Sequence, residues 1–423
     1  MTVGRERLGV RDWSAARAAF DDALVVDPRH APALVGRARA RIGLGDVDGA
    51  LDDADAAVDL APDDADAWYV RGDARARRGD DEATEERALA DFRRALGLDP
   101  GHPEALEARG WFRFNTRDQL EGALEDFTRA LERGPRPTAL ARRGMARMHQ
   151  GDRAGGMADF AASLALEPSA LVHHERARIY FEEGELALAL ADLDRAFALE
   201  PHWSHQHLRG LVKRDLGDLA GAEADLVQAA EAQDGSPLAW TQVGDVRQQR
   251  GDLPGAEAAY TRAIEGEPRR PAAWVARGSV RAVRRDARGA RADFDQAVAV
   301  APREALGWLA RGDLRHAEGD VDGALDDWGR AADLDPRDPW APFNRGSALH
   351  NRGDHEAAAV EFGRAIDREP RMGLALAGRG AARAALGDRR GARDDLRRAL
   401  PLLPPESREW KEAQALLQAV SQE

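Results

Sequence analysis

The chain has 423 residues, of which 32% are charged and only 6% aromatic, and its formal net charge is −14 at pH 7. It contains no cysteine, which excludes disulfides, thiolate chemistry and cysteine-ligated metals. The acidic balance argues against a nucleic-acid partner, because such partners need basic stripes. The longest apolar runs are far shorter than the ~20 residues of a membrane span, and no secretory signal opens the sequence, so we expect no membrane partner and a cytoplasmic protein.

A motif of about 34 residues returns from one end of the chain to the other. Each copy has a helix that carries Gly, then Gly-Asp, then Ala-x-x-x-Phe, then Pro. A period of this length is typical of a solenoid built from helix pairs. We place twelve repeats near residues 1–30, 31–64, 65–102, 103–136, 137–169, 170–202, 203–236, 237–270, 271–304, 305–338, 339–372 and 373–405.

Two positions of each repeat predict how its helices cross. The eighth residue is always Gly or Ala, which lets two helices approach closely: Gly4, Ala38, Gly72, Gly110, Gly144, Ala177, Gly210, Gly244, Gly278, Gly312, Gly346 and Gly380. The twentieth is Ala in every repeat except one, which has Gly156, and a large apolar residue usually follows four positions later on the same helical face. Gly-Asp pairs end the first helix and begin the second, and Pro ends the second.

Ten repeats carry Arg just before the eighth position, and the same ten carry an acid just before the aromatic of the second helix. The two repeats without this Arg have Val3 with Ala19 and Val243 with Ala259, so both charges are lost together. We therefore predict an Arg-carboxylate bridge between the two helices of each of these repeats, semi-buried and bidentate. Most of these charged residues would then be scaffold and would not bind a ligand.

These positions resemble the tetratricopeptide repeat family over residues 1 to about 405, with Trp68, Trp240, Trp274 and Trp308 at the family's Trp position. The chain departs from the family by having Arg where Leu is usual. The resemblance implies an all-α fold: a right-handed α-solenoid, or superhelix, of about twelve helix-turn-helix units. Residues 406–423 would add a C-terminal capping helix that lays Trp410, Leu416, Leu417 and Val420 over the last repeat.

Some features depart from the regular repeat. Repeat 3 has four extra residues in the acidic stretch 80–86, which we expect to lengthen its inter-helix turn, and repeat 4 has one near Asn115. The first repeat lacks the first turn of its first helix. We expect either a fragment of a longer protein or a frayed first helix.

In the family, first helices line a concave groove, and the resemblance implies that their second, fifth, sixth, ninth, twelfth and thirteenth residues contact partners. Repeats 4 to 7 carry apolar, aromatic and polar residues there, and we predict partner binding by Trp111, Phe114, Asn115, Met145, Met148, His149, His174, Phe181 and His207. The alternative is that Trp111, Phe114 and Phe181 pack as extra core. A weaker candidate cluster in repeat 11 is Trp340, Phe343, Asn344, His350 and Asn351.

Five histidines in repeats 6 and 7 invite a metal interpretation: His173, His174, His202, His205 and His207. No Cys or carboxylate stands at ligand spacing beside them, so we expect solvated or partner-contacting histidines, no metal and no cofactor.

The leading functional hypothesis is a non-enzymatic scaffold that binds a peptide or an extended protein segment in its groove. An alternative is the regulatory or substrate-recruiting arm of a larger enzyme whose catalytic domain is outside this chain. A third is self-association through the first helix. The sequence offers no catalytic residues: it has no Cys nucleophile, no Gly-rich phosphate loop and no Ser-His-Asp grouping.

Overall fold

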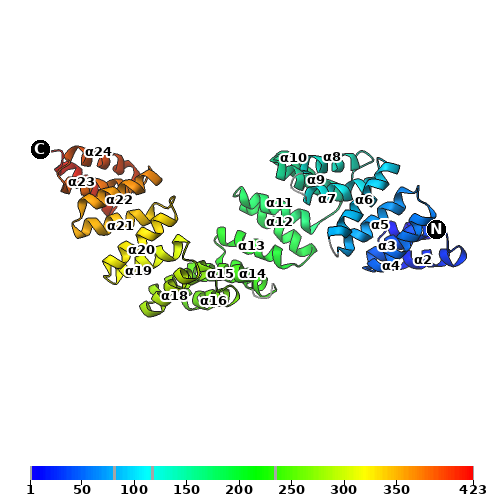
Figure 1. Cartoon of the computed structure of the whole chain (residues 1–423), viewed down its shortest axis with the longest axis horizontal. Helices are drawn as coiled ribbons and strands as arrows, with labels where there is room; N and C mark the ends of the chain where they lie inside the picture. The colour runs from blue at the N-terminus through cyan, green and yellow to red at the C-terminus, as the bar shows by residue number, and fades with distance from the viewer. Residues whose placement is uncertain (1, 80–81, 116–118, 233–235, 423) are drawn as a thin grey trace. The chain divides into compact units, whose positions relative to one another are not determined.

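The computed structural model describes residues 2–79, 82–115, 119–232 and 236–422, and over these ranges all regular secondary structure is helical. Two compact parts are present, the N-terminal segment Met1–Pro201 and the C-terminal segment His202–Glu423. Figure 1 labels most of their helices.

The N-terminal segment contains six pairs of helices. They are α1 (Thr2–Gly9), α2 (Trp13–Val26), α3 (Ala31–Leu44), α4 (Val47–Leu60), α5 (Ala65–Arg78), α6 (Glu82–Leu98), α7 (Pro103–Asn115), α8 (Leu120–Ala130), α9 (Pro137–Gln150), α10 (Arg153–Leu166), α11 (Ala170–Glu182) and α12 (Leu186–Leu199).

The C-terminal segment continues with six more pairs and a last helix. They are α13 (Trp203–Asp215), α14 (Leu219–Ala232), α15 (Pro237–Gln249), α16 (Leu253–Gly266), α17 (Pro271–Val283), α18 (Ala287–Val300), α19 (Ala305–Ala317), α20 (Val321–Leu334), α21 (Trp340–Arg352), α22 (His355–Arg368), α23 (Gly373–Ala385), α24 (Arg389–Ala399), the short 3₁₀ helix η2 (Leu400–Leu402) and α25 (Arg408–Ala419).

Within each segment the two helices of a repeat pack against each other, and the second helix packs against the first helix of the next repeat. First helices also contact first helices, as α7 does α9 and α21 does α23. This layering is the predicted α-solenoid of helix-turn-helix units. We call the side lined by the first helices the first-helix face.

The Gly-Asp pairs form the turn within a repeat, as predicted. Gly45 ends α3 in the left-handed conformation at φ 81°, and the Asp46 side chain then accepts a hydrogen bond of 3.1 Å from the Gly49 amide at the start of α4. Such a side-chain cap satisfies a backbone donor that has no partner within the helix. In repeats 1 and 9, Arg11 and Arg285 adopt the left-handed conformation in place of Gly.

The insertion in repeat 3 differs from the prediction. Asp80 and Asp81 lie outside the described residues, but α6 begins at Glu82 and spans 17 residues, where α4 spans 14. Most of the extra sequence therefore lengthens the second helix instead of the turn. Its composition explains this, because Glu and Ala are strong helix formers.

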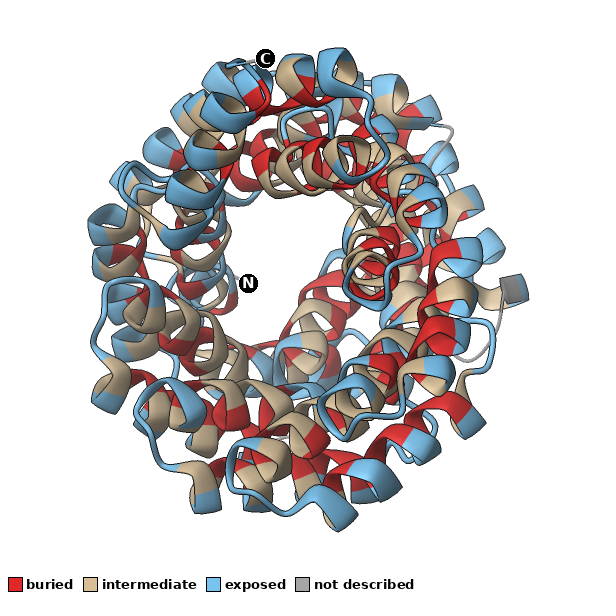
Figure 2. Ribbon diagram, turned by 90° about the vertical axis from the view of Figure 1, so that its left-hand side faces the viewer, coloured by how far each residue is buried: buried red, intermediate tan, exposed pale blue. Residues whose placement is uncertain are grey.

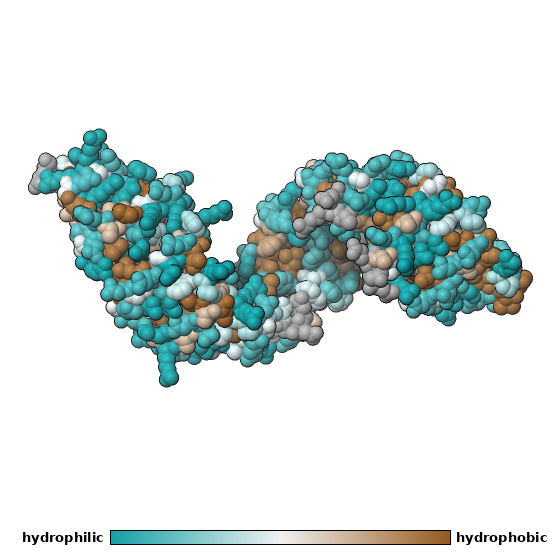
Figure 3. Space-filling model, viewed as in Figure 1, coloured by the Kyte–Doolittle hydropathy of each residue, from teal (hydrophilic) through white to brown (hydrophobic). Residues whose placement is uncertain are grey.

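The eighth position is small because an aromatic ring of the same repeat occupies the space beside it. A Cβ built on Gly72 would lie 2.6 Å from a ring carbon of Phe92, and one on Gly278 would lie 2.6 Å from Phe294. Figure 2 shows the buried residues along the faces that neighbouring helices share. Figure 3 shows a mostly hydrophilic surface with hydrophobic residues in separate patches.

The predicted Arg-carboxylate bridges are present in all ten repeats. Arg311, for example, donates from Nε and Nη2 to the two carboxylate oxygens of buried Asp327, at 2.8 Å each. The pairs are Arg37–Asp53, Arg71–Asp91, Arg109–Asp126, Arg143–Asp159, Arg176–Asp192, Arg209–Asp225, Arg277–Asp293, Arg311–Asp327, Arg345–Glu361 and Arg379–Asp395. The Glu361 pair makes one hydrogen bond from Arg345, where the other pairs make two.

A second cation, one helical turn after the first, completes most of these sites and was not predicted. Arg315 Nη1 forms an ion pair with Asp327 Oδ2, the oxygen that accepts from Arg311 Nε, at 2.9 Å, and donates to the Gly323 carbonyl at 3.2 Å. Burial raises the pKa of Asp225, but hydrogen bonds from Arg209 and Lys213 outweigh it, so the net effect is a lowered pKa. The buried carboxylate is thus held in its charged form.

Several of these arginines also reach back to the preceding repeat. Arg37 Nη1 lies 2.9 Å from Asp21, and Arg311 Nη1 lies 3.0 Å from Asp295. One guanidinium thereby joins three helices. In repeat 8, Val243 and Ala259 are both buried and replace the ion pair with an apolar contact.

At its end, the C-terminal segment presents α25 against α23 and α24. Val420 is buried there, and Trp410, Leu416 and Leu417 pack on the cluster that includes Leu376 and Leu396. Within the described ranges no helix combines the length and the apolar character needed to cross a bilayer.

Candidate functional site

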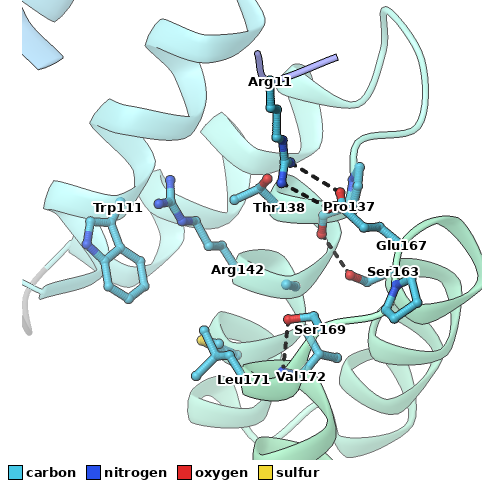
Figure 4. Close-up of a pocket in the computed structure, with 13 residues that line it drawn as sticks. Arg11, Trp111, Pro137, Thr138, Arg142, Ser163, Glu167, Ser169, Leu171 and Val172 are labelled. Atoms are coloured by element: carbon cyan, nitrogen blue, oxygen red, sulfur yellow. Dashed lines mark hydrogen bonds and ion pairs between the residues drawn. The ribbon is translucent and has the colours of Figure 1, made fainter. Parts of the chain in front are cut away.

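A cavity of about 280 Å³ opens on the first-helix face of the N-terminal segment (Figure 4). Helices α7, α9 and α11 and the end of α10 form most of it. Its lining residues are Arg11, Trp111, Pro137, Thr138, Ala141, Arg142, Met145, Ser163, Glu167, Pro168, Ser169, Leu171 and Val172. We call it the N-terminal pocket.

Local sequence signals position these walls. Ser169 precedes α11, and its hydroxyl accepts a hydrogen bond of 3.4 Å from the Val172 amide as the helix cap. On α10, the Ser163 hydroxyl donates to the Pro137 carbonyl at 2.9 Å, which fixes the start of α9 against α10. Leu171, the second residue of α11, is left 55% exposed and contributes apolar surface to the pocket.

Arg142 is the charged group of this pocket that forms no ion pair with a carboxylate within the described part of the chain. Its guanidinium carbon lies 5.0 Å from the centre of the Trp111 ring, and its one hydrogen bond is long, 3.5 Å to the Glu107 carbonyl. Figure 4 shows the Arg142 side chain directed toward Trp111. Burial lowers the pKa of Arg142, although a guanidinium stays protonated at neutral pH. The pocket therefore offers a half-buried cation beside an aromatic ring.

A distant part of the chain contributes the rim. Arg11, in the turn between α1 and α2, forms an ion pair with Glu167 at 3.1 Å, and both side chains are largely exposed. The N-terminal segment thus curves enough to bring the first repeat beside the end of the fifth. An exposed pair of this kind contributes about 0 to 1 kcal/mol.

The predicted partner-binding residues occupy different environments. Trp111 and Met145 line the N-terminal pocket. Trp111 also stacks on Phe114 at 5.6 Å between ring centres, and both pack on the cluster around Phe127. Phe114 meets the exposed His149 edge-on at 5.1 Å. The aromatic pair therefore combines a packing contact with a wall of the pocket.

The other predicted residues lie apart from this pocket. Met148 fills the helix crossing beside Gly156, where a Cβ would lie 2.5 Å from its sulfur. Asn115 is exposed at the end of α7, and His174 and Phe181 are partly buried on α11. His207 belongs to the C-terminal segment and hydrogen-bonds Gln242.

Sequence reasoning missed several lining residues, namely Arg142, Leu171, Val172 and Arg11. Arg142 and Leu171 occupy the sixth and second positions of their first helices, which are among the groove positions named above. A search of those positions for unpaired charge and exposed Leu would have found them. No sequence signal indicated Arg11, because its place depends on the curvature of five successive repeats.

The five histidines considered as ligands have other partners or settings. His173 is buried and hydrogen-bonds the scaffold acid Asp192 at 2.9 Å, and His202 caps α13 by accepting from the Ser204 amide. Nowhere in the described part of the chain do three potential metal ligands gather.

Family models agree with the repeat chemistry. The model described as tetratricopeptide repeat matches residues 3–65, 35–83, 174–237 and 243–287, and that described as TPR repeat matches 312–353. Together they cover more than half of the sequence. The chain belongs to the tetratricopeptide repeat family.

Solved structures of similar folds include three that we compare here. A tetratricopeptide repeat protein from Parabacteroides merdae is 17% identical, with 60% of this chain and 98% of that chain covered and a TM-score of 0.45. Yeast Tom70 is 13% identical, with 99% and 94% covered and a TM-score of 0.48. YrrB, described as a TPR protein with an unusual peptide-binding site, is 21% identical, with 46% and 97% covered and a TM-score of 0.37. No curated protein matches the chain.

Proposed function

We propose that the N-terminal segment binds an extended segment of a partner protein on its first-helix face, as part of a non-enzymatic scaffold. The tetratricopeptide repeat architecture is in general that of a protein-protein interaction scaffold. The observation that supports this site is the N-terminal pocket, where apolar walls adjoin Arg142, a cation that forms no ion pair with the described carboxylates.

The chemistry of the pocket indicates what the partner offers. At about 280 Å³ it lies at the small end of ligand pockets, which suits one side chain better than a whole cofactor. Met145, Leu171 and Val172 favour a large apolar side chain. The Arg142 guanidinium favours a carboxylate next to it, because a charge-assisted hydrogen bond formed away from bulk water is strong.

A binding role accounts for the polar groups of the pocket better than catalysis does. The hydroxyl of Ser163 already donates to a backbone carbonyl, and that of Ser169 already accepts from an amide. No histidine is among the described residues that line the pocket, and its one lining carboxylate, Glu167, forms an ion pair with Arg11.

A peptide selection on the full chain tests the proposal. Random capped peptides selected on the wild type are expected to carry Asp or Glu next to a large apolar residue. They should lose at least about tenfold in affinity on Leu171→Asp and on Arg142→Gln, which each remove one feature of the pocket.

Leu238→Asp is the matched control. Leu238 also stands at the second position of a first helix and is 45% exposed, but it lies in the C-terminal segment. Circular dichroism verifies that all variants fold. Selected peptides that bind Leu171→Asp and Arg142→Gln as tightly as they bind Leu238→Asp would overturn the proposal.

A further inference from the structure

A second cavity, of about 370 Å³, lies in the C-terminal segment between α21, α23 and α25. We propose that this C-terminal pocket binds an extended segment of a partner protein that carries a large apolar side chain next to Lys or Arg. This site differs from the N-terminal pocket in its helices and in its charge, and it stands independently of the function proposed above.

The walls of the pocket are apolar and held in place. Phe343 on α21 forms one wall and is fixed by two ring contacts, edge-on with Trp340 at 5.8 Å and tilted against Phe362 at 5.9 Å. Leu374 on α23 and Leu416 on α25 form others. Small residues of α23 leave the space open: Ala377, Gly378 and Ala381.

The helix α25 therefore does two things. Its apolar side packs on the last helix pair, and from that side Ala413 and Leu416 also line the pocket, while the exposed Glu409 and Glu412 complete its rim. A side chain bound here would contact α25 as well as the repeats. If α25 only covered the end of the solenoid, no cavity beside it would be needed, so the cavity favours a second role for this helix.

The charge of the rim is negative. The charged residues that line the pocket are Glu409 and Glu412, and no Arg or Lys is among its described lining residues. Glu412 forms only an exposed pair with Arg408, at 2.7 Å. Burial, and then the neighbouring His355, lower the pKa of His350, so this lining residue is neutral at pH 7.

Asp313, on the neighbouring first helix α19, is a further carboxylate with the same negative charge as Glu409 and Glu412. It accepts hydrogen bonds from Trp328 Nε1 at 2.8 Å and from Asn344 Nδ2 at 3.0 Å, and Asn344 is next to Phe343 on α21. Both donors are neutral. By contrast Asp327 of the same repeat, which is a scaffold acid, is bound by two arginines.

These observations favour a cationic partner over an acidic one. The walls bind an apolar side chain, and the two glutamates at the rim attract a neighbouring cation. Asp313 does not line the pocket, but on the neighbouring first helix it is an acceptor for a cation further along the extended segment. Charges at a rim fix partner choice and association rate more than raw affinity. A basic flank is therefore the feature that should distinguish partners of this pocket.

An array of capped peptides probes this preference on the full chain. Each peptide has a central Leu, Ile or Phe flanked by Lys/Arg, by Asp/Glu or by Ser, and binding is measured by fluorescence polarisation. We expect the Lys/Arg-flanked set to bind about tenfold more tightly than the Asp/Glu-flanked set. Glu409→Lys/Glu412→Lys should abolish that preference, and Ala377→Trp, which fills the cavity, should weaken binding of every set.

Two controls separate this pocket from general charge and from the first site. Glu356→Lys/Glu406→Lys makes the same change in net charge at exposed residues that do not line the pocket, and should keep the preference. Leu171→Asp should also keep it. Thermal unfolding shows which variants fold. The proposal is overturned if basic and acidic flanks bind equally, if both double variants behave alike, or if Leu171→Asp removes the binding.

Discussion

The bridge between Arg311 and Asp327 allows a quantitative test of the scaffold. The Asp327 side chain is 2% exposed, accepts two hydrogen bonds from Arg311 and forms an ion pair with Arg315. Breaking a buried ion pair by removing one partner costs about 3 to 5 kcal/mol. Arg311→Ala leaves Arg315 on the carboxylate, so we expect about 2 to 3 kcal/mol, the value of hydrogen bonds to a charged group. Removing Arg315 as well should bring the cost to about 4 to 5 kcal/mol.

The measurement must be local, because a repeat array opens repeat by repeat and a single global free energy is not defined for it. Hydrogen exchange followed by mass spectrometry reports the opening free energy of peptides from α19 and α20. Peptides from α9 and α10 serve as an internal reference. Arg303→Ala, an exposed Arg at the end of the preceding repeat, is the control and should change the result by less than about 0.5 kcal/mol.

A double-mutant cycle then decides whether the two residues act as a pair. Arg311→Val/Asp327→Ala copies the apolar combination of repeat 8. It should cost less than Asp327→Ala alone, because Asp327→Ala leaves both Arg311 and Arg315 without the buried carboxylate, whereas the double variant leaves only Arg315 without it. Additive effects of the two substitutions would refute the bridge as an energetic unit, whatever its geometry.

Three further predictions concern packing, acid stability and curvature. Gly278→Ala should destabilise repeat 9 by about 1 to 3 kcal/mol through overlap with Phe294, and Phe294→Leu should relieve part of this loss, as hydrogen exchange of peptides from α17 and α18 in the single and double variants would show. Asp192 and Asp225 have pKa values below the unfolded value of about 3.9, so they contribute stability above about pH 4 that is lost as the pH falls through the folded pKa. The urea midpoint should therefore be similar at pH 7 and pH 5 and drop at pH 3, and Asp225→Asn should reduce that drop. Glu167→Ala should change the melting free energy by about 1 kcal/mol or less, and a larger change in a thermal melt would contradict a weak exposed pair.

Most of the fold could be predicted because its signals are local and repeated. Gly-Asp and Pro determine where helices end within a few residues, and twelve copies average out the noise of any one. The bridges could be predicted for a further reason. Repeat 8 has Val243 and Ala259 at the Arg and acid positions, and the joint loss of both charges indicates that the two residues form a pair. The insertion of repeat 3 was misplaced because helix propensity at Glu82 and beyond extended α6 instead of the turn.

The candidate site could be predicted only in part. Trp111 and Met145 stand out as large groups at groove positions, and both line the N-terminal pocket. Met148 has the same signature but fills a crossing that Gly156 leaves open, which depends on a neighbour in the other helix. Arg142 is one Arg among many in sequence, and it is distinguished only in three dimensions, where its guanidinium lies beside the Trp111 ring and forms no ion pair with a carboxylate of the described residues.

The arginine that joins three helices has a consequence for how such a chain grows. Arg37 meets Asp53 within its repeat and Asp21 in the repeat before, and Arg311 does the same with Asp327 and Asp295. A repeat that has both this Arg and an acid directly after its aromatic residue can therefore form the ion pair on both sides. Its Arg pairs with the acid of the repeat before it, and its acid pairs with the Arg of the repeat after it. Gene duplication of one such repeat would insert a module whose borders already fit, with no compensating substitution in its neighbours. Designed arrays could be lengthened or shortened in the same way at these junctions, whereas a cut beside Val243 would expose an apolar border.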